Sequence, residues 1–200
     1  IIYDSVTITQ PNVLDAISTI TNVSCNGGND GTASLTISGG TPFDTTTGAA
    51  WQYLEDWGIF TPANLAAGIY NYTITDSLGC TYLDSVLITE PLVISVSSTT
   101  TDVSCFGGNN GTVILNISGG TPGFTEDWGS NNPNALSSGT YSYTITDANT
   151  CTFSDSVTIT EPTAITSVID TIVDLTSCLV ANGSIDLTPD GGVGPYTYLW

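Results

Sequence analysis

The stretch Gly139-Thr140-Tyr141-Ser142-Tyr143-Thr144-Ile145-Thr146-Asp147 decides the fold class, because apolar and polar side chains alternate along its whole length. Alternation with a period of two, in residues that are β-branched or aromatic, is typical of a half-buried β-strand. The same alternation recurs at 113–118 and 157–160, and turn-forming Gly, Asn, Asp and Pro residues separate the segments. No segment has convincing helical periodicity. The sequence therefore predicts an all-β fold.

The stretch at 139–147 has a second copy at 68–76, which reads Gly-Ile-Tyr-Asn-Tyr-Thr-Ile-Thr-Asp. Other motifs recur in the same order. They are Cys-x-Gly-Gly-Asn-x-Gly-Thr at 25–32 and 105–112, Ile-Ser-Gly-Gly-Thr-Pro at 37–42 and 117–122, and Asp-Ser-Val-x-Ile-Thr-(Gln/Glu)-Pro at 4–11, 84–91 and 155–162. A degenerate copy of the first motif, at 176–184, aligns Cys178 with Cys25. Ordered self-similarity of this kind indicates a tandem-repeat protein.

The closing prolines Pro11, Pro91 and Pro162 set the frame of the repeats. We predict that residues 1–11 end a preceding repeat and contain its last strand. Residues 12–91 form the first complete repeat, 92–162 the second, and 163–200 the truncated start of a further one, here called the third repeat segment. The first repeat is longer because of a loop insertion at roughly 44–53. We expect the chain to be a window from a longer protein.

Each complete repeat contains several short strands within about 70–80 residues and one central Trp. This pattern predicts a two-sheet β-sandwich similar to immunoglobulin domains. Trp57 and Trp128 are predicted to fill the core from a central strand, and Tyr70 and Tyr141 to mark tyrosine corners. Short, proline-containing connections between the repeats predict a semi-rigid, rod-like array.

The charge balance excludes several classes of function. Among 200 residues there are 19 acidic ones and no Lys, Arg or His, which gives a net charge of −19. Nucleic acids and anionic lipids need cationic contacts. Catalytic triads need a His, and Walker-type phosphate loops need a Lys. The adjacent pairs Glu55-Asp56 and Glu126-Asp127 would point to opposite faces of a strand, so they do not predict a glycosidase dyad. We therefore expect no enzyme activity, no catalytic residue and no nucleic-acid partner.

Each complete repeat contains two cysteines at corresponding positions. Cys25 and Cys80 bracket the first repeat, Cys105 and Cys151 bracket the second, and Cys178 is left for a partner beyond residue 200. Pairing within each repeat treats all repeats alike, so we predict the disulfides Cys25–Cys80 and Cys105–Cys151. Each would add roughly 4 kcal/mol in the chain-entropy model. Other pairings are open, and five free thiols in a cytosolic protein are the alternative. Disulfides would indicate an oxidising, extracellular location.

Asn29, Asp30 and Asp76 are the candidate metal ligands, because calcium prefers oxygen donors and often meets acidic secreted proteins. The second repeat has Asn110 where the first has Asp30, which argues against a required site. The alternative for Asn29 and Asp30 is a Gly/Asn turn. The alternative for Asp76, and for its counterpart Asp147, is an Asp that caps a turn at the end of a strand. We expect no required cofactor or metal.

The ordered motif set, from Cys-x-Gly-Gly-Asn-x-Gly-Thr through Gly-x-Tyr-x-Tyr-Thr-Ile-Thr-Asp to Val-x-Ile-Thr-Glu-Pro, resembles the SprB repeat over essentially the whole chain. This repeat is found in very large surface adhesins of gliding bacteria. Two features depart from it, the 44–53 insertion and the degenerate loop at Cys178. The resemblance implies type IX secretion, exposure at the outer membrane, and a role in attachment or gliding.

The Asp-Ser-Val triplets resemble an O-glycosylation acceptor pattern of the same bacteria, which makes Ser5, Ser85 and Ser156 candidate acceptors. The alternative is that Asp and Ser begin the last strand while Val enters the core. Both can hold, because neighbouring side chains on a strand face opposite ways.

These observations lead to the hypothesis of a non-catalytic stalk segment in a cell-surface adhesin filament. Its expected partners are other repeats of the same long chain, glycans or other external surfaces, and gliding or secretion machinery reached through regions outside this sequence. One alternative is an array of carbohydrate-binding modules that uses the 44–53 insertion and Trp51. Another is a self-assembling matrix or sheath protein.

Overall fold

The computed structural model describes residues 6, 8–44, 46 and 52–199. The candidate residues Ser5 and Trp51 lie outside these ranges. The chain divides into two compact units, one of residues 1–93 with 119–121 and one of 94–118 with 122–200. The four-part division at residues 11, 91 and 162 stays a prediction.

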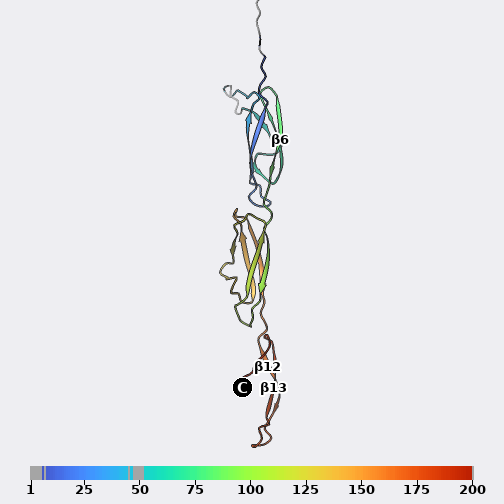
Figure 1. The fold of residues 1–200 in the computed structure, drawn as a ribbon, viewed down its shortest axis with the longest axis vertical. Coiled ribbons are helices and arrows are strands. Elements are labelled where there is room, and N and C mark those ends of the chain that lie inside the picture. Colours follow the sequence, from blue (N-terminus) through green and yellow to red (C-terminus); the bar gives the residue numbers. More distant parts are fainter. Residues whose placement is uncertain (1–5, 7, 45, 47–51, 200) are drawn as a thin grey trace, which may run out of the picture. The chain divides into compact units, whose positions relative to one another are not determined.

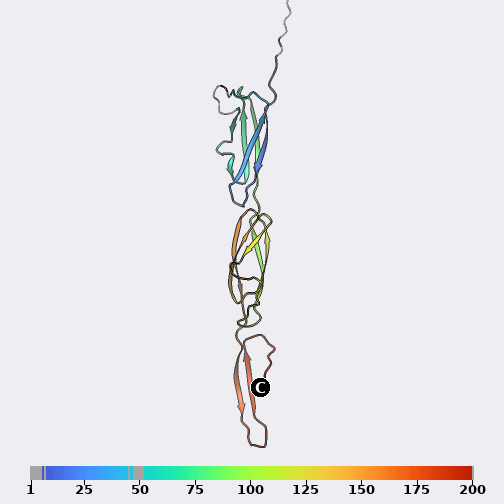
Figure 2. The same ribbon diagram turned by 90° about the vertical axis from the view of Figure 1, so that its left-hand side faces the viewer.

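The first repeat is built from two open antiparallel sheets, whose strands run side by side in both views of the unit (Figures 1 and 2). One sheet has the order β1-β2-β4 and the other the order β3-β5-β6. Their bounds are β1 Asp15–Thr21, β2 Gly31–Ser38, β3 Leu54–Asp56, β4 Ala63–Leu65, β5 Gly68–Thr75 and β6 Thr81–Ile88.

The second repeat has the same plan. Its bounds are β7 Ser95–Thr101, β8 Thr112–Ser118, β9 Thr125–Asp127, β10 Gly139–Thr146 and β11 Thr152–Ile159. β7 pairs with β8, and the other sheet has the order β11-β10-β9. A single bridge between Gly111 and Leu136 takes the place of the β2–β4 ladder. The prediction of an all-β, sandwich-like fold is confirmed.

The third repeat segment forms one long hairpin of β12 Thr166–Val173 and β13 Ser184–Asp190, drawn in red in Figure 1. Its ladder has an irregularity between Ile169 and Thr171. Every residue of β12 is exposed. The hairpin corresponds to β1–β2, and no described residue forms a β5–β6 counterpart to cover it.

Two hydrophobic cores follow from the predicted alternation. On β10, Tyr143 and Ile145 are buried, whereas Ser142 between the aromatic residues is exposed. On β11, Val157 and Ile159 are buried and Thr158 is exposed. The first core takes its buried residues from positions 14–88, and the second from 94–159. Each complete repeat therefore has a core of its own.

Trp57 and Trp128 lie in these cores, as predicted, with 6% of each side chain exposed. Trp57 packs on Tyr72 and Trp128 on Tyr143, with ring centroids 4.9 and 5.0 Å apart. Their predicted position on a central strand is wrong. Each Trp follows a three-residue edge strand. A glycine with positive φ comes directly after the Trp and turns the chain, so the strand does not continue through the Trp.

The tyrosine corners are confirmed. The hydroxyl of Tyr70 donates to the carbonyl of Ala66 at 3.0 Å, and that of Tyr141 donates to the carbonyl of Ser137 at 3.1 Å. Each bond closes the turn that leads into β5 or β10, so it fixes where the central strand of its sheet begins.

The expected strand at residues 1–11 is absent from the part that the structure describes. Residues 6 and 8–11 carry no strand, and Val6 and Ile8 are 85% and 93% exposed. Their counterparts Val86 and Ile88 are buried, because β6 pairs with β5 along its whole length. No described residue offers the start of the chain such a partner.

Candidate functional site: the two poles of each repeat

The polar residues that recur between repeats gather at the two ends of the strands. We call the end where the chain enters a repeat its N-terminal pole, and the end where it leaves the C-terminal pole. In the first repeat the N-terminal pole contains Asn12, Gly40, Thr41 and the turn 76–80. The C-terminal pole contains the loop 22–30 and the closing residues 89–91.

Asp76 organises the N-terminal pole. One of its carboxylate oxygens accepts the backbone N–H of Thr41 at 2.9 Å, and the other accepts those of Leu78 and Cys80 at 3.0 and 2.8 Å. The side chain is 1% exposed. Backbone donors, that of Thr41 first, hold the pKa of Asp76 below its usual value, although burial acts in the opposite direction. Asp76 is therefore a charged, fully bonded turn cap.

Asp147 has the same place in the second repeat, with 4% of its side chain exposed. One of its oxygens accepts the backbone N–H groups of Asn149 and Cys151, both at 2.9 Å. The sequence alternative of a turn-capping Asp at 76 and 147 is confirmed.

Glu90 organises the C-terminal pole, and the sequence analysis missed its role. Its carboxylate accepts the backbone N–H of Gly27 at 2.6 Å and the side-chain amide of Asn26 at 3.1 Å. Glu161 accepts from Gly107, also at 2.6 Å. The sequence carried a signal for this contact, because each complete repeat has both a Cys-x-Gly-Gly loop and a closing Thr-Glu-Pro motif.

A second clasp at this pole holds the closing threonine. The backbone N–H of Thr89 donates to the side-chain oxygen of Asn22 at 2.9 Å. In the second repeat the N–H of Thr160 donates to Asp102 at 2.8 Å, and this bond holds the pKa of Asp102 below its usual value. Asn and Asp thus do the same structural work at one position.

The side chain of Asp30 closes the Cys-x-Gly-Gly loop by hydrogen bonds to Ser24. Its oxygens accept the backbone N–H of Ser24 at 3.0 Å and the Ser24 hydroxyl at 2.5 Å. In the second repeat the backbone N–H of Ser104 donates to the side-chain oxygen of Asn110 at 3.1 Å, and the amide nitrogen of Asn110 donates to the Ser104 hydroxyl at 2.8 Å. An amide replaces the carboxylate here because both carry an oxygen that accepts the backbone N–H.

In the third repeat segment the loop uses Asn182, which bonds Thr176 through both its oxygen and its nitrogen. This places Thr176 at the position of Ser24. Cys178 therefore lies one residue later in its loop than Cys25 does, which corrects the sequence alignment.

The candidate calcium ligands do not come together. Asp76 lies at the N-terminal pole, whereas Asp30 and the exposed Asn29 lie at the C-terminal pole. Among the described residues, no group of three or more acidic, Cys or His side chains is arranged to hold a metal ion. The expectation that no metal is required stays a prediction.

The predicted disulfides within repeats are wrong. Cys80 and Cys105 are exposed free thiols, as is Cys178, whereas Cys25 and Cys151 are disulfide-bonded. Cys25 lies two residues from Gly27 at the C-terminal pole, and Cys80 lies in the turn at the N-terminal pole. The β5–β6 ladder from Thr75–Thr81 to Gly68–Ile88 separates these poles by about 23 Å. A disulfide requires Cα atoms within about 7 Å of each other.

The adjacent carboxylates before each Trp also have structural partners. Glu126 accepts the indole N–H of Trp128 at 2.9 Å, and Asp127 accepts the backbone N–H of Gly129 at 2.8 Å. Glu55 and Asp56 do the same in the first repeat. Each pair orients the Trp and caps the turn after it.

The candidate glycosylation residues Ser85 and Ser156 are exposed, whereas the following valines are buried. Asp84 and Asp155 each accept the backbone N–H of the following serine, at 2.8 and 2.7 Å. The side chains of Ser and Val thus face opposite ways, as expected. Glycosylation itself stays a prediction.

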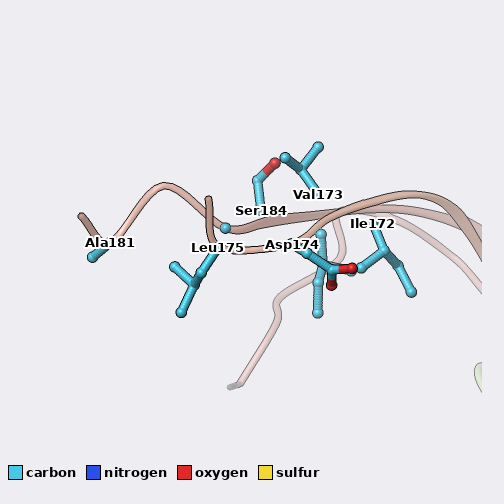
Figure 3. A pocket seen from close by; sticks show the side chains of 8 residues that line it. Ile172, Val173, Asp174, Leu175, Ala181 and Ser184 are labelled. Carbon is cyan, nitrogen blue, oxygen red and sulfur yellow. The ribbon is translucent and has the colours of Figure 1, made fainter. Parts of the chain in front are cut away.

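A hollow of about 720 Å³ lies on the third repeat segment (Figure 3). Its lining includes Ile172, Leu175, Gly183 and Ile185. In the first repeat, Gly31 stands where Gly183 does, and it packs against Leu65 and Ile88. The hollow therefore lies where the first repeat has packed core residues.

Comparison with known proteins agrees with the repeat pattern. The family model described as the SprB repeat matches residues 17–43, 97–132 and 170–200. The chain belongs to the SprB-repeat family. Each match covers most of the first hairpin of a repeat, including the Cys loop at the C-terminal pole. No curated protein and no solved structure matches the chain significantly.

SprB repeats are structural repeats of surface-exposed adhesins and are not known as catalytic units. Within the described residues, no helix has the length and apolar character needed to span a membrane.

Proposed function

We propose that this chain is a non-catalytic stalk segment of a secreted adhesin filament, which spaces an adhesive region from the cell surface and carries load. The supporting observation is the path of the chain through each complete repeat. It enters at one pole, where Gly40 bonds Asn12, and leaves at the other, where Asn26 bonds Pro91. Repeats linked in this way are pulled at opposite ends.

The first and last strands of each repeat run in the same direction and contact each other, β1 with β6 and β7 with β11. Tension on the two chain ends therefore slides these strands past each other along their length. Sliding loads many side-chain contacts of the core at once, whereas peeling a hairpin loads its hydrogen bonds one after another. This arrangement suits a load-bearing element.

The recurring polar residues support a scaffold role as well. The acidic side chains at Asp76, Glu90 and Glu126 have partners within their own repeat. What recurs between repeats builds the fold and leaves no recurring cluster of polar groups directed at a ligand among the described residues. With a charge of −19 and no cationic side chain, neighbouring chains repel each other at low salt.

A labelled antibody fragment against the second repeat, applied to living source cells, tests this function. Signal on intact cells supports a surface stalk, and signal that travels along the cell assigns it to gliding. A fragment against a periplasmic protein is the control. Staining that appears only after permeabilisation would overturn the proposal.

One observation favours the carbohydrate-binding alternative. A hollow of about 250 Å³ beside the insertion is lined by Tyr53, Gln52 and Glu55, which supply the aromatic, amide and carboxylate groups that sugars bind. Glycan-array binding by the chain, lost in Trp51→Ala or Tyr53→Ala, would support this function. If the chain binds no glycan on the array, the carbohydrate-binding function is contradicted and the stalk function is the one that remains.

A further inference from the structure

In the second SprB repeat, the strand β8 has a neighbour on one of its two sides for only part of its length. Among the described residues, its sheet contains only β7 and β8. On the side away from β7, a single bridge joins Gly111 to Leu136. The N–H of Val113 then donates to the carbonyl of Pro133 at 2.9 Å, and no described residue continues this pairing. We call residues 115–117 on this side the open edge of β8.

The alternation of the backbone shows which groups face the open edge. In an antiparallel ladder, the N–H and C=O groups of successive residues point in turn to the two neighbouring strands. Gly111 and Val113 bond away from β7. Leu115 and Ile117 therefore also point away from β7, whereas Asn116 between them faces it. No described residue bonds the backbone of Leu115 or Ile117 on this side, so their N–H and C=O groups are open to an added strand.

The side chains beside the open edge face the core but are only half-buried. Val113, which lies next to the last bonded neighbour, is 5% exposed. Leu115 and Ile117 pack against the same core and are half-buried. The opposite side of the sandwich differs, because β7 contacts β11 there. An added strand would bury more of Leu115 and Ile117, and this burial would stabilise it in addition to its backbone hydrogen bonds.

The first repeat has a similar edge on β2, but one end of that edge is occupied. It borders a hollow of about 250 Å³, whose lining includes Leu35, Ile37 and Glu55. The hydroxyl of Tyr53 donates to the carbonyl of Gly39 at 2.8 Å, two residues beyond Ile37 on the same side of the backbone. Phe124 stands where the first repeat has Tyr53, four residues before the Trp, and it has no hydroxyl. The open edge of β8 therefore lacks this cap.

Charge decides which kind of strand fits the open edge. Natural proteins protect exposed edges with Lys, Pro or other charged residues, but β8 reads Thr-Val-Ile-Leu-Asn-Ile-Ser and contains none of them. The chain has 19 acidic and no basic residues, so a second copy would be repelled at low salt. Glu55 lines the hollow beside the β2 edge, and Glu126 is its counterpart in the second repeat. An extended segment that carries Lys or Arg would be attracted.

We propose that the open edge of β8 binds an extended, cationic segment of another protein, which adds to the sheet as a further strand. The backbone of this segment pairs with the N–H and C=O groups of Leu115 and Ile117. Its inward side chains are apolar and cover the core beside these residues, while its Lys or Arg residues face the acidic surface. The proposal does not depend on the stalk function, because the edge belongs to a single repeat.

Amide hydrogen exchange of the isotope-labelled 200-residue chain, followed by NMR, tests the proposal. The probe is a synthetic peptide of alternating Val and Thr with Lys at both ends. Without the peptide, Leu115 and Ile117 should exchange rapidly, whereas Asn116 is protected by β7. Saturating peptide should slow exchange at Leu115 and Ile117 by at least about tenfold and leave Asn116 unchanged. No slowing at millimolar peptide, or protection of Leu115 and Ile117 without it, would overturn the proposal.

Two control peptides test the pairing and the charge separately. N-methyl groups on the amides that would face β8 prevent pairing, so the methylated peptide should give no protection. A peptide with Glu in place of Lys should bind at least about tenfold more weakly at low salt. Equal affinity of the Lys and Glu peptides would overturn the cationic partner. Protection that rises with protein concentration would instead assign the edge to a second copy, and would overturn it as well.

A matched pair of variants tests the edge itself. Ile117→Pro removes an N–H group that faces the open edge and none that bonds β7, so it should weaken peptide binding. Ile114→Ala should leave binding unchanged, because that side chain is exposed on the outer face of β8. Equal binding by Ile117→Pro and the wild type would contradict the proposal. If Ile117→Pro does not fold, the exchange pattern of the wild type with the two Lys peptides, methylated and unmethylated, still decides.

Discussion

At the scale of single residues, this protein uses carboxylates and amides interchangeably at two positions where a single backbone N–H needs an acceptor. Asn22 and Asp102 hold the closing threonines, and Asp30 and Asn110 close the Cys loops. Asp76 and Asp147 are different, because their buried side chains receive several backbone donors from one turn. We therefore expect the charge to be needed only at Asp76 and Asp147.

The clasp at Asp102 leads to an acid-stability prediction. Its pKa is lowered by the Thr160 N–H, so its contribution is present above the ordinary value near 3.8 and is lost as pH falls through the folded-state pKa. Asp102→Asn should keep the melting temperature at pH 7, because Asn22 makes the same bond in the first repeat. Between pH 4 and pH 2 the variant should lose less stability than the wild type. Calorimetry over this range measures the difference.

Asp76→Asn is the matched contrast. An amide has one acceptor oxygen, whereas the carboxylate of Asp76 uses two oxygens for three N–H groups. The melting temperature of the first repeat should therefore fall at pH 7 already. If Asp76→Asn and Asp102→Asn both keep the wild-type melting temperature at pH 7, the charge of Asp76 is not needed and its side chain acts only as a hydrogen-bond acceptor.

At the scale of elements, each sheet is fixed by what ends its strands. Tyrosine corners start β5 and β10, Gly58 and Gly129 end the short edge strands, and Gly39 and Gly119 turn the chain at the N-terminal pole. The edge strands β3 and β9 have only three residues, and each is followed by the Trp that fills the core.

The Trp that follows the short edge strand is predicted to be essential for its repeat. Trp128→Ala removes a buried side chain that packs on Tyr143, which costs about 3–5 kcal/mol of unfolding free energy. Ile114→Ala on β8 is the control, because that side chain is 63% exposed and its loss should change stability by about 0.5 kcal/mol or less. Chemical denaturation of both variants measures the two values. Similar losses would contradict the assigned core.

Two glycines with the same backbone angle give a second prediction. Gly119 and Gly107 both have φ of 72°. A Cβ on Gly119 would lie 1.9 Å from the carbonyl oxygen of Val93, whereas one on Gly107 would meet nothing within 4 Å. Gly107→Ala should cost only the left-handed backbone penalty of about 1–2 kcal/mol, and Gly119→Ala should prevent the second repeat from folding. Thermal unfolding by circular dichroism distinguishes them, and equal melting temperatures would contradict the turn geometry.

At the scale of the whole molecule, each complete repeat is closed on itself, because it has a core of its own. The chain enters the first repeat at the pole of Asn12 and Gly40 and leaves it at the pole of Asn26 and Pro91, so tension on its two ends acts along the strands.

The amino-acid sequence by itself determined the all-β strand pattern, the family and the aromatic cores, because each of these depends on local alternation or on copies that can be compared directly. Only the tertiary structure decided which pole each cysteine occupies. Between Cys25 and Cys80 the chain reverses direction several times, and two of the strands involved, β3 and β4, have three residues each. Strands that short leave no periodic signal. In the folded repeat, β1 and β6 run in the same direction and pack on one core. This packing fixes the number of chain reversals between Cys25 and Cys80, and therefore the end of the sandwich at which Cys80 lies.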